Sequence, residues 1–289
     1  MNNHQILIAD CGATKSDWSL VERGKITHRF LSIGISPIFQ TQEEIAKEIK
    51  DRAFPQFKDA SLDAIYFYGA GCTPEKAEEV KEAIYSSFPI NKIETHSDIV
   101  GAARSLCGNE HGIACILGTG SNSCEWNGKE ITNQTPPLGY ILGDEGSGAC
   151  MGKLLVNSVL KNLLSEALKE KFLKQYKLTQ STIIENVYNQ PFPNRFLASI
   201  SPFLSQNIEE EAIIHIVKKS LADFFERNIM QYGYQNSKVH FIGSIAHYYS
   251  TFLKEVAAEK GITIGKIEIS PIGGLVEYHN NQFDSQTEI

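Results

Sequence analysis

Hydrophobic and polar positions alternate along the first thirty residues and then change to helical spacing. Short β-rich runs are separated by turn residues at Asp10 to Gly12 and at Arg23 and Gly24. They predict an antiparallel meander of three strands over residues 5–9, 17–21 and 25–30. After it, apolar residues at helical spacing alternate with buried-strand runs. This pattern predicts helices over residues 42–53 and 74–88, strands over 62–68 and 92–95, and a helix from Ser97 or Asp98 to Cys107.

A polar, glycine-containing break, GNEHG at residues 108–112, separates two halves with a similar rhythm. The second half restarts with a buried strand at 113–117 and a glycine-rich turn, and becomes helix-rich from Gly146. Helices are predicted over residues 150–172, 181–188, 195–205 and 209–232, then a strand over 238–242, a helix from Ser244, a strand over 266–269 and a helix over 271–278. We therefore expect an N-terminal lobe of residues 1–109 and a C-terminal lobe of residues 110–289, whose last helix is able to pack back on the N-terminal lobe.

The amino-acid composition excludes several classes of function. The 289 residues suit about two domains, and 42% hydrophobic and 21% charged residues are typical of a globular protein. The net charge is -7 and no cluster of Lys and Arg occurs, which excludes nucleic acid as an expected partner. No apolar run approaches the roughly 20 residues needed to cross a bilayer, so we expect no membrane contact and a cytoplasmic location. The six cysteines form no CxxC pair, which indicates reduced, mostly buried thiols.

Two loops rich in glycine and hydroxyl residues each follow a buried strand. In the first, Gly12 allows close approach of the backbone, Thr14 and Ser16 offer hydroxyls, and Lys15 is either a phosphate ligand or a solvated side chain. Asp10, at the strand end, suits hydrated Mg²⁺. The alternative for this segment is an ordinary hairpin. The second loop contains Gly118, Thr119, Gly120, Ser121 and Asn122, and neither loop has the Walker spacing.

These two loops, together with Gly143-Asp144-Glu145-Gly146-Ser147, resemble the motifs of the sugar kinase/chaperone/actin ATPase superfamily. Within it the chain is similar to the BadF/BadG/BcrA/BcrD ATPase family, and specifically to its N-acetylglucosamine kinase branch. The resemblance implies an α/β fold of two ribonuclease-H-like (actin-like ATPase) lobes with an interlobe cleft that closes over ATP and a sugar. It implies an ATP-dependent kinase that converts N-acetylglucosamine to its 6-phosphate with Mg²⁺. The resemblance leaves open whether the protein forms a homodimer.

The resemblance also implies roles for single residues. The phosphate contacts are Gly12, Thr14, Lys15, Ser16, Gly118, Thr119 and Gly120, and the adenosine side has Gly243 and Ser244. The sugar contacts are Ser121, Asn122, Gly139, Tyr140 and Asp144. Gly243 and Ser244 also suit a simple strand-to-helix turn. Asp144 has helix capping as its alternative, with Ser147 as the other candidate cap.

Asp98 matches the catalytic aspartate of the family. Phosphoryl transfer depends on positioning and charge stabilisation, and a carboxylate that accepts the proton of the acceptor hydroxyl completes such a site. The alternative is that Ser97 or Asp98 caps the following helix.

One departure concerns the sugar. Relatives have an Asn after the third strand, where this chain has Ser36, whose shorter side chain would have to replace that contact. Two further functions stay open: a related glucosamine or N-acetylmuramate kinase, and an ATP-driven activator protein of the BadF type. The activator would need clustered cysteine ligands for an iron-sulfur cluster, and the cysteines here are scattered.

Overall fold

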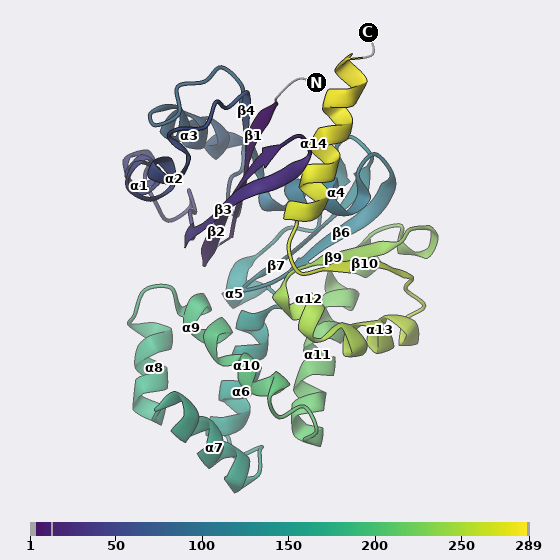
Figure 1. Cartoon of the computed structure of the whole chain (residues 1–289). Helices are drawn as coiled ribbons and strands as arrows, with labels where there is room; N and C mark the ends of the chain where they lie inside the picture. The colour runs from purple at the N-terminus through teal and green to yellow at the C-terminus, as the bar shows by residue number, and fades with distance from the viewer. Residues whose placement is uncertain (1–3, 13, 288–289) are drawn as a thin grey trace. The chain divides into compact units, whose positions relative to one another are not determined.

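The computed structural model describes residues 4–12 and 14–287. The chain divides into two compact units. The first consists of Met1–Glu110, Gly128–Glu130 and Ser270–Ile289, and the second of His111–Asn127 and Ile131–Ile269. Each contains one five-stranded mixed sheet with helices, which confirms the predicted α/β fold (Figure 1).

The sheet of the first unit has the strand order β3-β2-β1-β4-β5. Its strands are β1 (Gln5–Cys11), β2 (Lys15–Glu22), β3 (Lys25–Ile33), β4 (Ala64–Gly69) and β5 (Ile93–Ser97). The first three form the predicted antiparallel meander, with Asp10 opposite Asp17. β4 runs parallel to β1, and β5 parallel to β4.

Alternate residues of this sheet enter two different cores. Leu7 and Ala9 of β1 face one cluster, which contains apolar residues of the helical segment 42–57 and of α3 (Pro74–Tyr85). Ile6 and Ile8 face the other cluster, which contains Leu275 of α14 (Ile272–Thr287). The helices of this unit are α1 (Gln42–Glu48), a π-helix (Ile49–Ala53), α2 (Phe54–Phe57), α3 (Pro74–Tyr85), α4 (Asp98–Cys107) and α14 (Ile272–Thr287).

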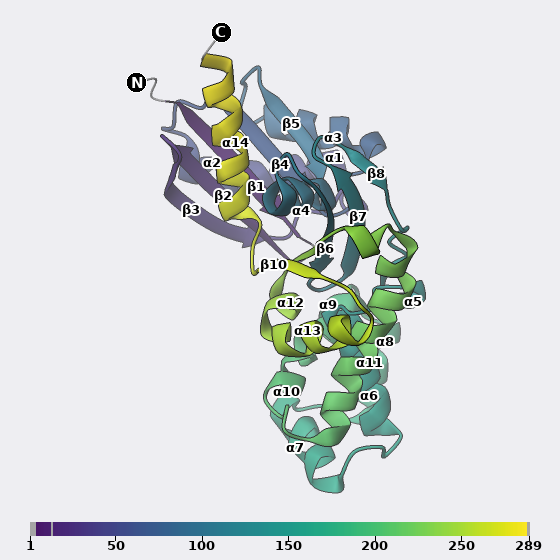
Figure 2. The same ribbon diagram turned by 90° about the vertical axis from the view of Figure 1, so that its right-hand side faces the viewer.

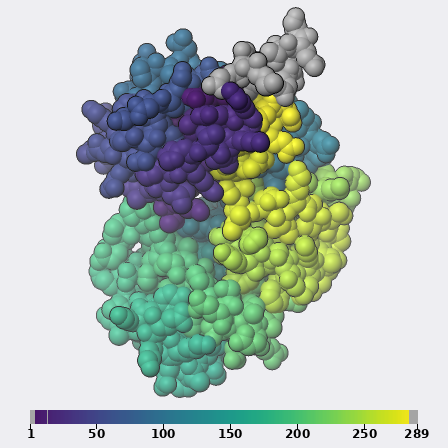
Figure 3. Space-filling view, in the orientation of Figure 1, coloured from purple at the N-terminus to yellow at the C-terminus, as the bar shows by residue number. Residues whose placement is uncertain are grey.

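The C-terminal helix α14 completes the first unit although it follows the second unit in sequence. It contacts α4 and β1, and Figures 1 and 2 show it beside α4 over one face of the sheet. In Figure 3 it lies at the surface, in yellow, next to the purple N-terminal strands. The helix was expected to end at Tyr278, but it continues to Thr287.

The sheet of the second unit has the order β10-β9-β6-β7-β8. Its strands are β6 (His111–Leu117), β7 (Ser121–Asn127), β8 (Ile131–Asn133), β9 (Val239–Ile242) and β10 (Ile264–Glu268). β6 pairs with β7 in antiparallel and with β9 in parallel orientation. The sequence pattern missed β7 and β8, because the buried side of β7 includes Ser123 and the strand therefore lacks a clear apolar alternation.

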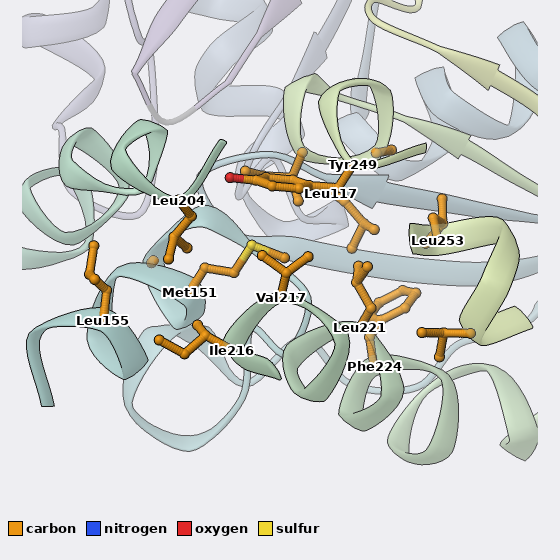
Figure 4. Packing of buried hydrophobic residues seen from close by; sticks show 14 of the residues in the cluster. Leu117, Met151, Leu155, Leu204, Ile216, Val217, Leu221, Phe224, Tyr249 and Leu253 are labelled. Carbon is orange, nitrogen blue, oxygen red and sulfur yellow. The ribbon is translucent and has the colours of Figure 1, made fainter. Parts of the chain in front are cut away.

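Helices and their apolar faces make up most of the second unit. They are α5 (Gly139–Leu142), α6 (Gly148–Leu160), α7 (Glu166–Tyr176), α8 (Gln180–Tyr188), α9 (Pro193–Ile200), α10 (Pro202–Ser205), α11 (Glu211–Arg227), two 3-10 turns (Ile229–Gln231 and Tyr234–Asn236), α12 (Ser244–Tyr248) and α13 (Ser250–Glu259). Figure 4 shows Met151 of α6 and Val217 of α11 in the same core, close to Leu117 at the end of β6.

The single helix predicted over residues 150–172 is wrong. The chain forms α6 and α7 instead, separated by a turn in which Asn162 has a φ of 55°. The side chain of Ser165 then accepts a hydrogen bond from the amide of Leu168 and caps α7. Apolar residues continue through this turn, so periodicity alone gave no sign of it. Within the described part of the chain, no helix has both the length and the apolar run that a membrane span requires.

Candidate active site

In the first unit, three parallel strand ends bring the predicted acidic residues to one edge of the sheet. Cys11 pairs with Gly69, and Gly69 pairs with Ser97, so the carboxyl ends of β1, β4 and β5 are level. Asp10 is the penultimate residue of β1, and Asp98 directly follows β5. Polar groups at such an edge are typical of ligand sites in α/β proteins.

Asp98 is the first residue of α4 and is half-buried. Its Oδ1 accepts a hydrogen bond from the amide of Ile99 at 2.8 Å, whereas Ser97, at the N-cap position, makes no capping bond with its side chain. Burial raises the pKa of Asp98 to about 6, against the opposing effect of backbone amide donors at the helix start. A carboxyl group that is half protonated near pH 6 is suited to exchange a proton with a substrate hydroxyl.

Asp10 is perturbed in the same direction. Burial raises its pKa to about 7, and the negative charges of Asp98 and Asp17 add to this, while Lys15 opposes it. The negative charge of Asp98 therefore acts on Asp10 across this edge of the sheet. A positive charge that arrived at this edge would offset the repulsion between these carboxylates and lower the pKa of Asp10, which is the property expected of a site for a cation.

Asp17, which the sequence pattern did not single out, lies opposite Asp10 on β2 and is buried. Arg29 on β3 donates from Nε to both of its carboxylate oxygens, at 2.8 and 3.0 Å. The Asp17 charge is thus neutralised by a bidentate ion pair, which limits its repulsion of Asp10. The partner is twelve residues away on another strand, so only the register of the meander reveals the pair.

The first glycine and hydroxyl loop is a tight hairpin between β1 and β2. The amide of Gly12 donates to the carbonyl oxygen of Lys15 at 2.9 Å, so the hairpin already uses that amide. Thr14 and Lys15 are exposed, and Ala13 lies outside the described residues. Ser16 is fully buried, and its hydroxyl accepts a hydrogen bond from the amide of Ile35. The hydroxyl of Ser16 therefore supports the loop after β3.

Ser36 lies in that loop and is also buried. Its amide donates to Oε1 of Gln40 at 2.8 Å, and its carbonyl oxygen accepts from the amides of Phe39 and Gln40. The Ser36 hydroxyl oxygen lies 3.5 Å from the position that a Cβ on Gly71 would take, so it borders the loop that follows β4.

In the second unit, the second loop and the Gly243–Ser244 turn lie at neighbouring strand ends. β6 and β9 are parallel, with Ile116 paired to Ile242. A Cβ on Gly243 would lie 2.2 Å from the carbonyl oxygen of Leu117, and the φ of Gly243 is 122°. Only glycine permits this approach. The structure thus brings together two of the predicted nucleotide segments.

The start of α6 frames the second loop. The amides of Gly148 and Ala149 donate to the carbonyl oxygens of Gly118 and Thr119 at 2.8 and 3.0 Å. A Cβ on Gly120 would lie 3.1 Å from Oδ1 of Asp144, so the loop passes directly over that carboxylate.

Asp144 does not cap α6, since Ser147 does so by accepting from the amide of Cys150. The Oδ1 of Asp144 instead accepts from the amide of Ser121 at 3.1 Å, and Asp144 has a φ of 58°, which is unusual for a residue other than glycine. Burial raises its pKa. Strained backbone together with a partly desolvated carboxylate is more typical of a binding residue than of a cap.

The other predicted sugar contacts lie near Asp144 in sequence or on β7. Asn122 accepts hydrogen bonds at its Oδ1 from Gln134 and from the amide of Ser123. Gly139 is exposed with a φ of 72°, and Tyr140 packs partly against the core of the unit. The sequence pattern did not single out Gln134, because this residue follows β8, a strand that the pattern did not predict.

No family model matches the chain, and no curated protein matches it. Among solved structures, a protein from Porphyromonas gingivalis described as a "putative N-acetylglucosamine kinase" is 48% identical, with a TM-score of 0.94 over 96% of this chain and 99% of that one.

Two more distant structures share the fold. A "putative N-acetylglucosamine kinase" from Chromobacterium violaceum is 15% identical, with a TM-score of 0.74 over 95% of this chain and 98% of that one. A glucokinase of the ROK family from Streptomyces griseus, solved with glucose and AMPPNP, is also 15% identical, with a TM-score of 0.59 over 95% of this chain and 97% of that one.

Proposed function

Because this chain belongs to the family of N-acetylglucosamine kinase-like proteins with the actin-like ATPase fold, we propose that it is an ATP-dependent kinase of an amino sugar. We take N-acetylglucosamine as the substrate and its 6-hydroxyl as the acceptor. The observation that carries the proposal is the placement of two carboxyl groups, Asp10 and Asp98, at the level carboxyl ends of parallel strands of the first sheet, where burial raises both pKa values. Structural carboxylates are usually paired and keep low pKa values, whereas groups that exchange protons or bind cations have perturbed ones.

In the proposed reaction Asp98 orients the acceptor hydroxyl and accepts its proton as the oxygen attacks the γ-phosphorus of ATP; the bond from that phosphorus to the β,γ-bridging oxygen breaks, and ADP leaves. The hydrogen bond from Ile99 holds this carboxylate in place at the start of α4. Thr14 and the Lys15 side chain, both exposed, serve the phosphates on the side of the first unit.

Asp10 would hold Mg²⁺, mainly through water. The donor set fits such an ion, because Mg²⁺ bound to a nucleotide needs only one or two carboxylates beside phosphate and water, and Asp10 supplies a carboxylate at the end of β1. When bound, the ion neutralises phosphate charge. Arg29 pairs with Asp17, so Asp10 and Asp98 are the carboxyl groups of this cluster whose pKa values are raised.

On the second unit, we assign Thr119 and the glycines beside it to the phosphates, Gly243 and Ser244 to the adenosine side, and Asp144 to two sugar hydroxyls. Asp144 is fixed by the Ser121 amide through one oxygen, Oδ1, which leaves Oδ2 to accept from a ligand.

The activator alternative finds no support in the cysteines. All six are buried in this chain. A cluster shared with a second copy would need thiols at the surface, so the kinase is the better-supported function.

The test is ADP release measured across N-acetylglucosamine, glucosamine, N-acetylmuramate and glucose, for the wild type and for Asp98→Asn. We expect N-acetylglucosamine to raise ADP release well above the background, and the variant to lose at least about a hundredfold in kcat. If no sugar raises ADP release, the kinase proposal is wrong. If the variant keeps full turnover, the role of Asp98 is wrong instead.

A further inference from the structure

The side-chain amide of Asn122 has a defined orientation. The backbone amide of Ser123 donates to its Oδ1 at 2.9 Å, and because a backbone N–H only donates, this contact identifies the oxygen. The Nε2 of Gln134 donates to the same oxygen at 3.0 Å. Both lone pairs of Oδ1 are therefore used, and Nδ2, with its two N–H donors, is the part of the amide that is left for a ligand.

A buried phenol holds this arrangement together. The hydroxyl group of Tyr232 accepts from the amide of Thr135 at 2.7 Å and donates to the carbonyl oxygen of Ser123 at 3.0 Å. Tyr232 is only 6% exposed. Ser123, which follows Asn122, and Thr135, which follows Gln134, are thus both hydrogen-bonded to the buried hydroxyl group of Tyr232. This hydroxyl group therefore holds the two segments that carry the exposed contact between Gln134 and Asn122.

The geometry points to Gln134 as a positioning residue that holds Asn122 as a hydrogen-bond donor, selective for the acyl carbonyl oxygen of an N-acylated amino sugar. This inference rests on the proposed function. A carbonyl oxygen only accepts hydrogen bonds, so it matches Nδ2 without competition. The ammonium group of a free amino sugar only donates and would place N–H against N–H, which leaves both groups unsatisfied. The chain therefore prefers N-acylated sugars over free amino sugars.

The decisive variant is Gln134→Glu, because the introduced carboxylate cannot donate to Oδ1 and instead attracts Nδ2, the donor that the inference assigns to the sugar. Gln134→Lys retains a donor and is the rescue variant. The matched control is Gln175→Glu: Gln175 is exposed in the same unit, and its Nε2 also donates to a side-chain carbonyl oxygen, that of Gln206.

Two quantities are measured for each protein: the dissociation constant of N-acetylglucosamine by calorimetry, and KM and kcat for N-acetylglucosamine and glucosamine. We expect Gln134→Glu to raise the dissociation constant and KM for N-acetylglucosamine about tenfold with kcat within about twofold of the wild type, while KM for glucosamine changes much less. Gln134→Lys and Gln175→Glu are expected to stay near the wild type.

Unchanged binding of N-acetylglucosamine by Gln134→Glu overturns the inference. Equal loss in Gln134→Lys overturns it as well, since the residue would then only support the fold. The proposed function fails separately, when wild-type protein transfers no phosphate to any sugar. In that case calorimetry still tests the orientation of Asn122.

Discussion

At the scale of single residues, burial and local hydrogen bonds act on Asp98 in opposite directions. Amide donors at the start of α4 stabilise the carboxylate, while burial destabilises it, and burial prevails because the pKa is raised to about 6. The residue type and its place before a helix are visible in the sequence. The pKa is not, because it depends on the atoms that other segments pack around the carboxyl group.

The pKa of Asp98 leads to a prediction for activity. A base must be unprotonated, so at saturating Mg²⁺ and ATP we expect kcat/KM for the sugar to rise about tenfold per pH unit below pH 6 and to level off above it. Steady-state assays from pH 5 to 8 measure this. A profile without an inflection in that range would contradict the role of Asp98.

The same shift affects stability with a definite sign. The pKa of Asp98 is higher in the folded than in the unfolded state. Its protonated carboxyl group therefore favours folding at acid pH, and this contribution to the free energy of unfolding is lost as the pH rises from about 4 through 6. At neutral pH the buried charge of Asp98 therefore lowers the free energy of unfolding. We expect Asp98→Asn to unfold at a higher urea concentration than the wild type, although it loses activity.

At the scale of elements, the contact of α14 with α4 shows how glycine decides packing. A Cβ on Gly274 would lie 2.3 Å from the carbonyl oxygen of Ser105, a backbone atom of α4. At the adjacent Gly273, no atom lies within 4 Å of that position. The sequence does not distinguish these two adjacent glycines, yet only Gly274 is needed for the close approach of α14 to α4.

These neighbours give a matched pair of substitutions. Gly274→Ala is expected to destabilise the protein by about 1–3 kcal/mol, because the backbone of α4 must shift. Gly273→Ala is expected to stabilise it by about 0.5–1 kcal/mol, because alanine loses less conformational entropy in a helix. The free energy of unfolding in urea measures both. Equal effects of the two substitutions would mean that the helices do not pack as described.

At the scale of the whole molecule, the two units are unequal in how the chain builds them. The second unit is nearly continuous, from His111 to Ile269, with Gly128–Glu130 as its one interruption. The first unit needs α14, because Leu275 and Val276 cover the face of its sheet that contains Ile6, Ile8 and Tyr66. Residues 1–110 by themselves leave this apolar face open to water.

Fragments test this difference. We expect residues 111–269 to fold alone, with cooperative thermal unfolding by circular dichroism. Residues 1–110 are expected to aggregate or stay partly unfolded, and a peptide of residues 270–287 added in excess should restore ordered structure. A stable, soluble fragment 1–110 with cooperative unfolding would show that α14 is dispensable for the first unit.

The sequence by itself determined the α/β class, the meander, the strand-then-loop motifs and the acidic residues at strand ends, because these depend on local periodicity and turn chemistry. Only the tertiary structure decided the Asp17–Arg29 pair, the contact of Asp144 with Ser121, and the orientation of Asn122. Each depends on a contact between residues 12 or 23 positions apart, in different strands or loops. Such contacts are set by packing, to which local patterns give no access.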